Sequence, residues 1–482
     1  KYLMVNHSKF YFITNITSAF LALFTLPIFT RLLSPEDFGV LALFILFGSI
    51  STQIISLSLD EATKKFFFDD LDFKLLNSTN LIFILFIFLI CGIFIFVFSS
   101  HISTFLFKGE ISSLLVVVSY ISGCLTYFFS YLNGLFIIKE KSYNYLIVNL
   151  LFTFFNPILA VIIILNSDLS YEARIISMIS ITLISISLSF YLNRDLFVQR
   201  FSKDNLKKSI IFSYPLVPSQ VISQLNEITD RYMTNYYLGL NSLGIFSIAI
   251  RISEISKLFI NSFLQSWTPF FLKNSNSGNK KRIVSGYFTI ISVITLSVYG
   301  ISIFSEEIVK FLTVKEFYFT IKYIPLICFS IFIVHIFTSL SANQIIYSEK
   351  TSSLVKITSI TFLINIFLNI LLIPKFQIYG AIIATTISGS ISAIYSFFLG
   401  QKYFYIPIRY QTLLHVIIIY IIFNIPIYIL MNLEINFILK IFIKVIIFLF
   451  LCLYLKKSKI LRKNFINQLC NAYTIFKKKF IK

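Results

Sequence analysis

The sequence predicts an all-α polytopic membrane protein with about fourteen transmembrane helices, and three observations lead to this prediction. Long uncharged runs recur along the chain, at 38–59, 75–100, 111–138, 142–167, 283–305 and 378–401. Hydrophobic residues make up 57% of the 482 residues and charged residues only 13%, where soluble chains carry about 25% charge. Each run exceeds the roughly 20 residues that cross a hydrocarbon core, where the backbone must form helices to satisfy its own hydrogen bonds.

Fourteen spans can be separated from the spacing of the apolar runs and of the polar residues between them. The last two are the least clearly separated, because Lys440 and Lys444 stand at the start of the final span. Lys444 is expected to snorkel toward the membrane surface or to pack against neighbouring helices. The spans are expected at about 10–32, 38–59, 79–100, 111–137, 143–165, 175–193, 210–238, 243–271, 283–305, 322–346, 354–373, 378–400, 412–432 and 437–455.

The distribution of Lys and Arg predicts the orientation of the chain. One set of alternate loops, taken with both termini, holds 29 basic residues, and the other set holds 7. Because basic loops stay in the cytoplasm, both termini are expected there, and the net charge of +20 is explained without nucleic acid. The tail 456–482 has nine basic and no acidic residues. We expect it to form an amphipathic helix on anionic lipid, and a site for a protein partner is the alternative.

An internal duplication is indicated by short matches at nearly constant spacing. Segment 33–42 resembles 238–247 at an offset of 205, and 138–142 resembles 347–351 at an offset of 209. These offsets equal six spans, so the two copies keep the same orientation and form two parallel six-helix lobes. Such lobes can rock about a central site, which favours a transporter over a channel. The predicted domains are therefore 1–200, 201–405, two appended helices at 406–455 and the tail at 456–482.

Charged residues inside spans are costly in lipid and usually mark function or an ion pair. The densest group lies in the seventh and eighth spans, three acidic and three basic residues, near the middle of the membrane. Two interpretations remain open: the charges neutralise one another and hold the lobe together, or they line a polar cavity between the lobes. The six residues are Glu227, Asp230, Arg231, Arg251, Glu254 and Lys257.

Further candidate site residues lie at the ends of the first two spans. Arg31 ends the first span, and it is expected either to snorkel to the outer interface or to contact an anion in a cavity. Asp60, Glu61 and Lys64 end the second span on the cytoplasmic side. They form either a solvated helix end or a charged ring on the substrate path. The carboxylates Glu227, Asp230, Glu254 and Asp60 are candidates for ion coupling or charge pairing.

Hinges are expected where the backbone can bend. Pro215 and Pro218 begin the seventh span, and proline removes a helical hydrogen bond, although a static kink is an equal alternative. Gly39 and Gly244 occupy equivalent positions in the repeat and are the other hinge candidates. The four histidines are scattered, so no metal site is expected. No GxxxxGK[ST] motif occurs, so ATP is not expected to drive transport. The open alternatives are an ion gradient, with H+ or Na+ as coupling ion, the membrane potential, or consumption of the sugar on the far side.

Several ordered motifs carry a resemblance to a known family. They are LPIFTRLLSPEDFG at 26–39, LSLDEATKKF at 57–66, YPL at 214–216, Asp230-Arg231, GIF at 244–246, AIR at 249–251, WTP at 267–269 and YGA at 379–381. Their order resembles that of bacterial polysaccharide-repeat-unit flippases, the Wzx-type O-antigen transporters of the MATE-like multidrug/oligosaccharidyl-lipid/polysaccharide exporter superfamily. This chain departs from the family pattern at Ser58, where Gly is usual, and at Lys65, where Arg is expected.

The resemblance implies a fold of two six-helix bundles forming a V, with extra C-terminal helices. It also implies a function: flipping undecaprenyl-pyrophosphate-linked oligosaccharide units for lipopolysaccharide O-antigen or capsule across the bacterial inner membrane. A polysaccharide polymerase and a chain-length regulator are then expected partners. The rivals are a drug/cation antiporter of the same fold, a peptidoglycan-precursor flippase, and a membrane-bound polymerase or glycosyltransferase. The family's cationic cavity carries over to Arg31, Lys64, Arg231, Arg251 and Lys257.

Overall fold

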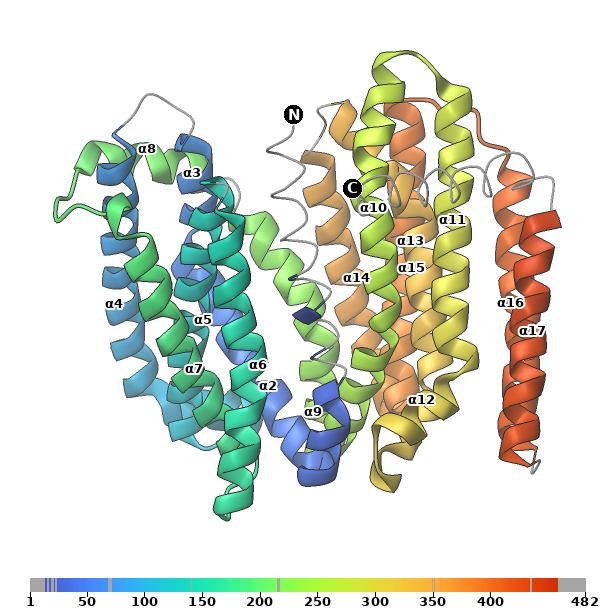
Figure 1. Cartoon of the computed structure of the whole chain (residues 1–482), viewed down its shortest axis with the longest axis horizontal. Helices are drawn as coiled ribbons and strands as arrows, with labels where there is room; N and C mark the ends of the chain where they lie inside the picture. The colour runs from blue at the N-terminus through green and yellow to red at the C-terminus, as the bar shows by residue number, and fades with distance from the viewer. Residues whose placement is uncertain are drawn as a thin grey trace. The chain divides into compact units, whose positions relative to one another are not determined.

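The computed structural model describes residues 14, 17–18, 21, 24–67, 72–139, 141–214, 217–348, 350, 352–433 and 436–457. Over these residues the secondary structure consists of helices joined by short turns (Figure 1). The predicted all-α class is confirmed. The predicted amphipathic tail lies, beyond Lys457, outside the described residues, as does part of the first predicted span.

The chain divides into two compact units. Unit 1 comprises Lys1–Ser247 with Leu312–Phe317, and unit 2 comprises Ile248–Phe311 with Tyr318–Lys482. This division follows packing and not the repeat, so the predicted domain boundaries at 200 and 405 stay a prediction. The helices that begin in unit 1 are α2 (Pro35–Ser56), α3 (Leu59–Phe66), α4 (Phe73–Phe107), α5 (Ser113–Ile138), α6 (Ser142–Asn166), α7 (Tyr171–Leu192), η1 (Arg194–Leu196), α8 (Lys203–Ser213) and α9 (Val217–Ser253).

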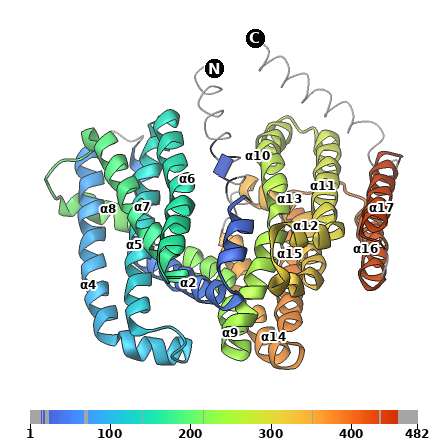
Figure 2. The same cartoon turned by 60° about the horizontal axis from the view of Figure 1, so that its bottom comes forward.

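Unit 2 is built around α11, α13 and α15. Helix α13 packs on both α11 and α15, and α14 packs on α15. The helices α16 and α17 form a hairpin at the edge of the unit (Figure 2), with α16 against α11. Its helices are α10 (Ile255–Asn276), α11 (Lys280–Ile303), α12 (Ser305–Leu312), η3 (Lys315–Lys322), α13 (Ile324–Tyr347), α14 (Ser352–Phe376), α15 (Ile378–Tyr403), α16 (Tyr410–Asn432) and α17 (Phe437–Lys457).

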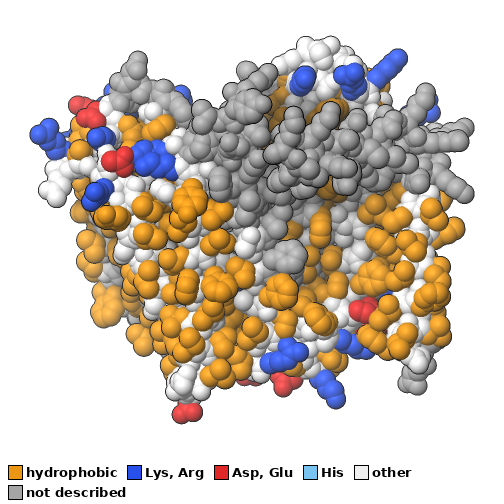
Figure 3. All heavy atoms as spheres, in the orientation of Figure 1, with side chains coloured by type: hydrophobic (Ala, Val, Ile, Leu, Met, Phe, Trp, Pro, Cys, Tyr) orange, Lys and Arg blue, Asp and Glu red, His pale blue; other side chains and the backbone are white. Residues whose placement is uncertain are grey.

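Eleven helices of the described chain are long and apolar enough to span a membrane, and each coincides with a predicted span. The predicted span at 210–238 corresponds to the end of α8 and the part of α9 before Gly239, and the span at 243–271 to the rest of α9 and most of α10; these helices are more polar. Hydrophobic side chains cover the sides of the helices on the face shown in Figure 3, and most charged side chains gather at the helix ends. The chain is therefore a multi-pass membrane protein.

Two helix starts explain the most conspicuous motifs of the repeat. Ser34 caps α2: its hydroxyl accepts a hydrogen bond from the Asp37 N–H at 3.1 Å, and its own N–H donates to the Asp37 carboxylate at 2.9 Å. Pro35 then occupies the first turn, where a missing N–H costs nothing. In the second copy, Gly239 interrupts α9 with φ 79° and ψ 177°, a backbone conformation essentially restricted to glycine. This break lies where a loop is predicted between the seventh and eighth spans.

The two repeat copies meet within unit 1 in a reciprocal contact. A Cβ atom at Gly39 would overlap the carbonyl oxygen of Leu240, and one at Gly244 would overlap the carbonyl oxygen of Pro35. Leu240 is the repeat equivalent of Pro35, and Gly244 of Gly39, at the offset of 205 residues. Each glycine therefore lets the other copy's backbone approach closely, as small residues do at helix contacts in membranes. This two-fold pattern supports the predicted duplication.

A buried ion cluster joins α17 to α12 inside unit 2. The ammonium of Lys444, whose side chain is 0% exposed, lies 2.7 Å and 2.9 Å from the two carboxylate oxygens of Glu307. It also lies 3.3 Å from the carboxylate of Glu306, which pairs with Lys310 at 2.7 Å and Lys440 at 3.6 Å. Of the two expectations for Lys444, snorkelling and packing, the structure shows packing, as a buried ion partner.

Candidate functional site

The larger of two adjoining cavities lies inside unit 1 and has a volume of about 550 Å³. Helices α2 and α5 supply most of its walls, with single or paired side chains from α3, α7 and α9. Most of the lining residues bear a hydroxyl or amide group, although apolar atoms cover more of the lining surface, and Asp60 is the one charged residue among the described lining residues. They are Phe44, Ile45, Gly48, Ser49, Thr52, Gln53, Ser56, Asp60, Ser119, Ser122, Gly123, Thr126, Tyr127, Ser130, Met178, Gln220 and Gln224.

A close crossing of α2 and α5 forms the back wall of this cavity. A Cβ atom at Gly123 would overlap the carbonyl oxygen of Gly48, so the two backbones touch there. The Thr52 hydroxyl lies 3.1 Å from the Gly123 carbonyl oxygen and bridges the two helices. Ser119 donates a hydrogen bond to the Phe44 carbonyl on the opposite helix. The small residues thus hold the crossing and leave their polar neighbours facing the cavity.

Matching polar stripes on these two helices line the cavity. On α2 and the start of α3 the polar positions are 49, 52, 53, 56 and 60, and on α5 they are 119, 122, 126 and 130. On α5 the series advances by three or four residues, and on α2 positions 49, 52–53 and 56 do the same, so each follows one helix face, while position 60 lies on α3 beyond the turn at 57–58. The two stripes face each other across the cavity, which is how two largely apolar helices enclose a polar space.

A second cavity, of about 330 Å³, adjoins the first. Asp60, Thr126 and Ser130 line both, and α6 contributes Tyr145 and Asn149 to the second. Lys64 lines only the second of the two cavities. The lining thus changes from neutral hydroxyl groups to a charged group across Asp60.

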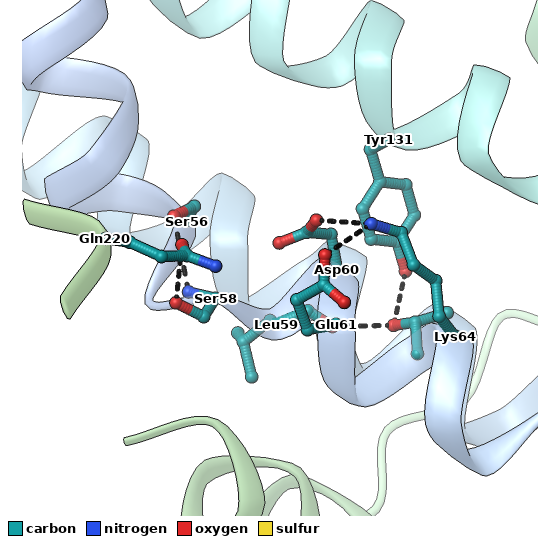
Figure 4. Close-up of polar contacts among 9 residues, drawn as sticks. Ser56, Ser58, Leu59, Asp60, Glu61, Lys64, Tyr131 and Gln220 are labelled. Atoms are coloured by element: carbon teal, nitrogen blue, oxygen red, sulfur yellow. Dashed lines mark hydrogen bonds and ion pairs between the residues drawn. The ribbon is translucent and has the colours of Figure 1, made fainter. Parts of the chain in front are cut away.

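Asp60 and Lys64 belong to a three-charge cluster on α3 (Figure 4). The Lys64 ammonium lies 3.0 Å from the carboxylate of Asp60 and 2.6 Å from that of Glu61. Burial alone would lower the pKa of Lys64, but hydrogen bonds and charge attraction from Glu61 and Asp60 outweigh it and raise that pKa. Lys64 therefore stays cationic, and the cluster carries a net charge of about −1.

The turn between α2 and α3 positions this cluster. Leu57 and Ser58 both adopt the left-handed backbone conformation, with φ of 42° and 55°. The Ser58 hydroxyl donates to the side-chain oxygen of Gln220 at 2.8 Å, which ties the turn to α9 (Figure 4). The neighbouring Thr63 hydroxyl lies 3.1 Å from that of Tyr131 on α5. Glycine tolerates a positive φ without strain, which accounts for the Gly that the family resemblance places at position 58.

We expect Ser58→Gly to leave the protein more stable than Ser58→Ala by about 1 kcal/mol. Both variants lose the hydrogen bond to Gln220, but only Gly relieves the left-handed strain. Thermal unfolding in detergent measures the difference. The same pair of changes at Ser187, an exposed position inside α7, should show the opposite order, because Gly is the poorer helix former there. An equal or lower stability for Ser58→Gly contradicts the prediction.

The other predicted residues of unit 1 whose side chains are described do not line these two cavities. Arg31 is exposed and donates a hydrogen bond to the Pro27 carbonyl at 2.7 Å. Asp230 is buried in α9, with 9% of its surface exposed, and the adjacent Arg231 is half-buried. Neither Arg31 nor Arg231 lines the two cavities, so of the predicted cations Lys64 alone does. Pro215 and the Glu227 side chain lie outside what the structure describes.

The predicted residues of unit 2 lie around the junction of α9 and α10. Glu254 and Lys257 form a half-exposed ion pair at 2.9 Å, as their spacing predicts. Arg251 is exposed at the end of α9.

The hinge candidates belong to unit 1. Pro218 is exposed in the first turn of α9, while Gly39 and Gly244 lie inside helices at the reciprocal contact. A hinge role for these residues stays a prediction.

Two features were missed by reading the sequence. The first is the hydroxyl lining of the larger cavity, for which the stripe spacing at 119, 122, 126 and 130 was an available signal. The second is the cluster of Lys444 with Glu306 and Glu307, whose members stand 137 and 138 residues apart. No local pattern in one sequence connects positions so distant.

The sequence and the fold are each similar to those of known proteins. A capsular polysaccharide biosynthesis protein of Staphylococcus aureus, CapF, is 22% identical over 426 residues, covering 83% of this chain and 100% of that protein. The lipid II flippase MurJ in an inward closed conformation has a TM-score of 0.72 at 18% identity, covering 92% of this chain and 98% of its own. An inward-facing multidrug resistance MATE transporter has a TM-score of 0.63 at 13% identity, covering 81% and 97%.

These similarities confirm the predicted superfamily fold. Both structural neighbours are transport proteins by name. The family of polysaccharide biosynthesis proteins matches residues 6–275, more than half of the chain. The chain therefore belongs to the polysaccharide biosynthesis protein family.

Proposed function

We propose that this protein is a flippase that moves undecaprenyl-pyrophosphate-linked oligosaccharide repeat units, of O-antigen or capsule, across the bacterial cytoplasmic membrane. A head group of sugar hydroxyls and pyrophosphate cannot cross hydrocarbon without replacement of its water. The observation that supports the proposal most is the pair of adjoining polar cavities inside a membrane-spanning helix bundle of this family. Alternating access would carry the head group through polar space while the prenyl chain stays in lipid.

The remaining assignments follow from the same proposal. Both termini lie in the cytoplasm, the basic tail binds anionic lipid, and a polymerase and a chain-length regulator act on the exported unit. An H+ or Na+ gradient drives the cycle through one of the carboxylates Asp60, Glu227, Asp230 or Glu254. Cations that would meet the pyrophosphate are Arg31, Lys64, Arg231, Arg251 and Lys257.

Deleting the gene tests the proposal directly. We expect one surface glycan to disappear while its lipid-linked unit accumulates on the cytoplasmic side. Protection of the accumulated unit from a glycosidase added to intact spheroplasts reports which side it occupies. A deletion strain that keeps all its surface glycans, or that accumulates no lipid-linked unit, contradicts the proposal.

Lys64→Gln is expected to slow export of the glycolipid about tenfold. The change leaves Asp60 and Glu61 without their cation, so the cluster goes from −1 to −2 and repels an anionic pyrophosphate. Because Lys64 is 42% exposed, solvent screening limits the penalty to on the order of 1–2 kcal/mol. Pulse-labelling of surface glycan in the complemented deletion strain measures the rate.

Two further variants make this test specific. Adding Glu61→Gln to Lys64→Gln restores the net charge of −1 and should recover most of the rate. Lys139→Gln is the matched control, because Lys139 also pairs with an acidic residue, Asp195, but lines neither cavity. Equal rates for Lys64→Gln and Lys139→Gln would remove Lys64 from the transport path.

A drug/cation antiporter is the second candidate, and one specific observation favours it: the charged lining residue of the larger cavity is acidic. An antiporter for cations would need Asp60 as its counter-ion. Expression in a drug-sensitive strain, with Asp60→Asn beside the wild type, decides between the two. Resistance to cationic dyes that depends on Asp60, together with an unchanged surface glycan in the deletion strain, would favour the antiporter.

A further inference from the structure

The hydroxyl groups that line the larger cavity have mostly donated their hydrogens to the backbone. Ser49 donates to the Leu46 carbonyl at 2.8 Å, Thr52 to Gly48 at 2.7 Å and Thr126 to Ser122 at 2.8 Å. Ser56 and Ser119 likewise donate to backbone carbonyls. A hydroxyl oxygen that has donated its hydrogen still offers lone pairs as an acceptor. These five hydroxyls therefore offer a ligand lone pairs only, while the Tyr127 hydroxyl, which has no hydrogen-bond partner among the described residues, can still donate.

The carboxylate and amide groups of the lining extend this pattern. Asp60 adds a charged acceptor at the end of the cavity that adjoins the smaller one. Gln53, Gln220 and Gln224 add amides, each with both donor and acceptor atoms. The oxygen of Gln220 already accepts from Ser58, so its amide N–H groups are the part left for a ligand. Hydrogen-bond acceptors and donors thus surround the cavity, and none of its described lining residues is cationic.

This arrangement suits a sugar better than a pyrophosphate. A pyrophosphate has acceptor oxygens and negative charge, so it would meet no cationic lining residue among those described and would be repelled by Asp60. A sugar ring carries several O–H groups, each of which donates one hydrogen bond and accepts others. The volume of about 550 Å³ also far exceeds the ~30 Å³ of one water molecule and lies in the usual range of small-molecule sites.

We propose that the larger cavity of unit 1 is a saccharide subsite, in which Thr126 and Asp60 accept hydrogen bonds from sugar hydroxyls of the transported unit and the Ser130 hydroxyl donates to and accepts from them. The inference rests on the proposed function and assigns this cavity to the sugar portion of the substrate alone. Thr126 and Ser130 are the sharpest probes, because both are exposed to the space and line both cavities. The pyrophosphate must then be held elsewhere.

Binding to two lipids that differ only in the sugar tests the proposal. The purified protein in nanodiscs is titrated with undecaprenyl pyrophosphate and with the saccharide-bearing lipid extracted from the deletion strain. We expect Thr126→Val and Ser130→Ala each to weaken binding of the saccharide-bearing lipid about threefold to tenfold. The Kd for bare undecaprenyl pyrophosphate should stay within about twofold of the wild type.

Thr104→Val is the matched control. Thr104 is also exposed on a membrane-spanning helix and also donates its hydroxyl to the carbonyl four residues earlier, at 3.0 Å, but it lies on α4 and lines neither cavity. The control should bind both lipids as the wild type does. If all variants lose binding alike, the effect comes from the helix and the proposal is overturned.

The remaining outcomes separate this inference from the proposed function. If the wild type binds neither lipid, the proposed function fails first. If it binds both and the cavity variants weaken the two lipids equally or not at all, the flippase assignment stands and the saccharide subsite is wrong. The same titrations are run in NaCl and in choline chloride. If the variants change only the ratio of the two Kd values, which reports how strongly binding depends on Na+, the cavity is a cation site and the proposal is overturned.

Discussion

Lys444→Met is expected to cost about 3–5 kcal/mol of folding free energy, because it removes the cation from a buried cluster. The Lys444 ammonium contacts both Glu306 and Glu307, and its side chain is wholly buried. Removing one partner of a buried ion pair leaves an uncompensated charge, and this is the source of the large cost. The loss should appear as a fall in the unfolding temperature of the protein in detergent, followed by the fluorescence of its tryptophan and tyrosines.

A control and a rescue make the Lys444 prediction decisive. Lys257→Met removes the cation of a Lys–Glu pair at a similar distance, 2.9 Å, whose side chains are 38% and 43% exposed. Exposed pairs contribute about 0–1 kcal/mol, so this variant should unfold close to the wild type. Adding Glu307→Gln to Lys444→Met removes the stranded carboxylate, while Glu306 keeps its pairs with Lys310 and Lys440, and should recover much of the loss. Similar losses for Lys444→Met and Lys257→Met would show that the cluster contributes little.

Most of the fold could be predicted from the sequence, because hydrocarbon leaves the backbone few choices. A run of some 20 apolar residues must be a helix there, and the eleven apolar spans of the described chain follow from that rule. The break at Gly239 was also predictable, since a polar turn interrupts the pattern. The contact of Glu306 and Glu307 with Lys444 could not be predicted, because no short-range pattern links residues 137 and 138 positions apart.

The candidate site was predicted less well, for a physical reason. Charge inside a membrane is a strong signal in a sequence, so the predicted site consisted mainly of arginines and lysines. Of these, only Lys64 lines either of the two cavities. Serine and threonine inside spans are a weak signal, because they can satisfy themselves on their own helix, as Thr126 does. The two stripes enclose a cavity because α2 and α5 cross closely at Gly48 and Gly123. That crossing is a tertiary contact, which a pattern along one helix does not reveal.

Gly39→Ala and Gly244→Ala are each expected to destabilise the protein by about 1–3 kcal/mol or more. In both cases the new Cβ atom would overlap a backbone carbonyl oxygen of the other repeat copy, Leu240 or Pro35, and backbone cannot move aside as a flexible side chain can. The helices α2 and α9 must then separate along the whole reciprocal contact. Unfolding temperature and the fraction of monodisperse protein on size exclusion measure the loss.

The reciprocity of this contact predicts how the two changes combine. Once one alanine has separated the backbones, the second meets an already open contact, so the double variant should lose clearly less than the sum of the single losses. Gly300→Ala is the control: it lies inside α11, where a Cβ would meet only the Phe448 ring at an ordinary 3.5 Å. That variant should be neutral or slightly stabilising, because alanine is the better helix former. Additive losses at Gly39 and Gly244 would mean that the two glycines act separately, and the two repeat copies would then not share one two-fold contact.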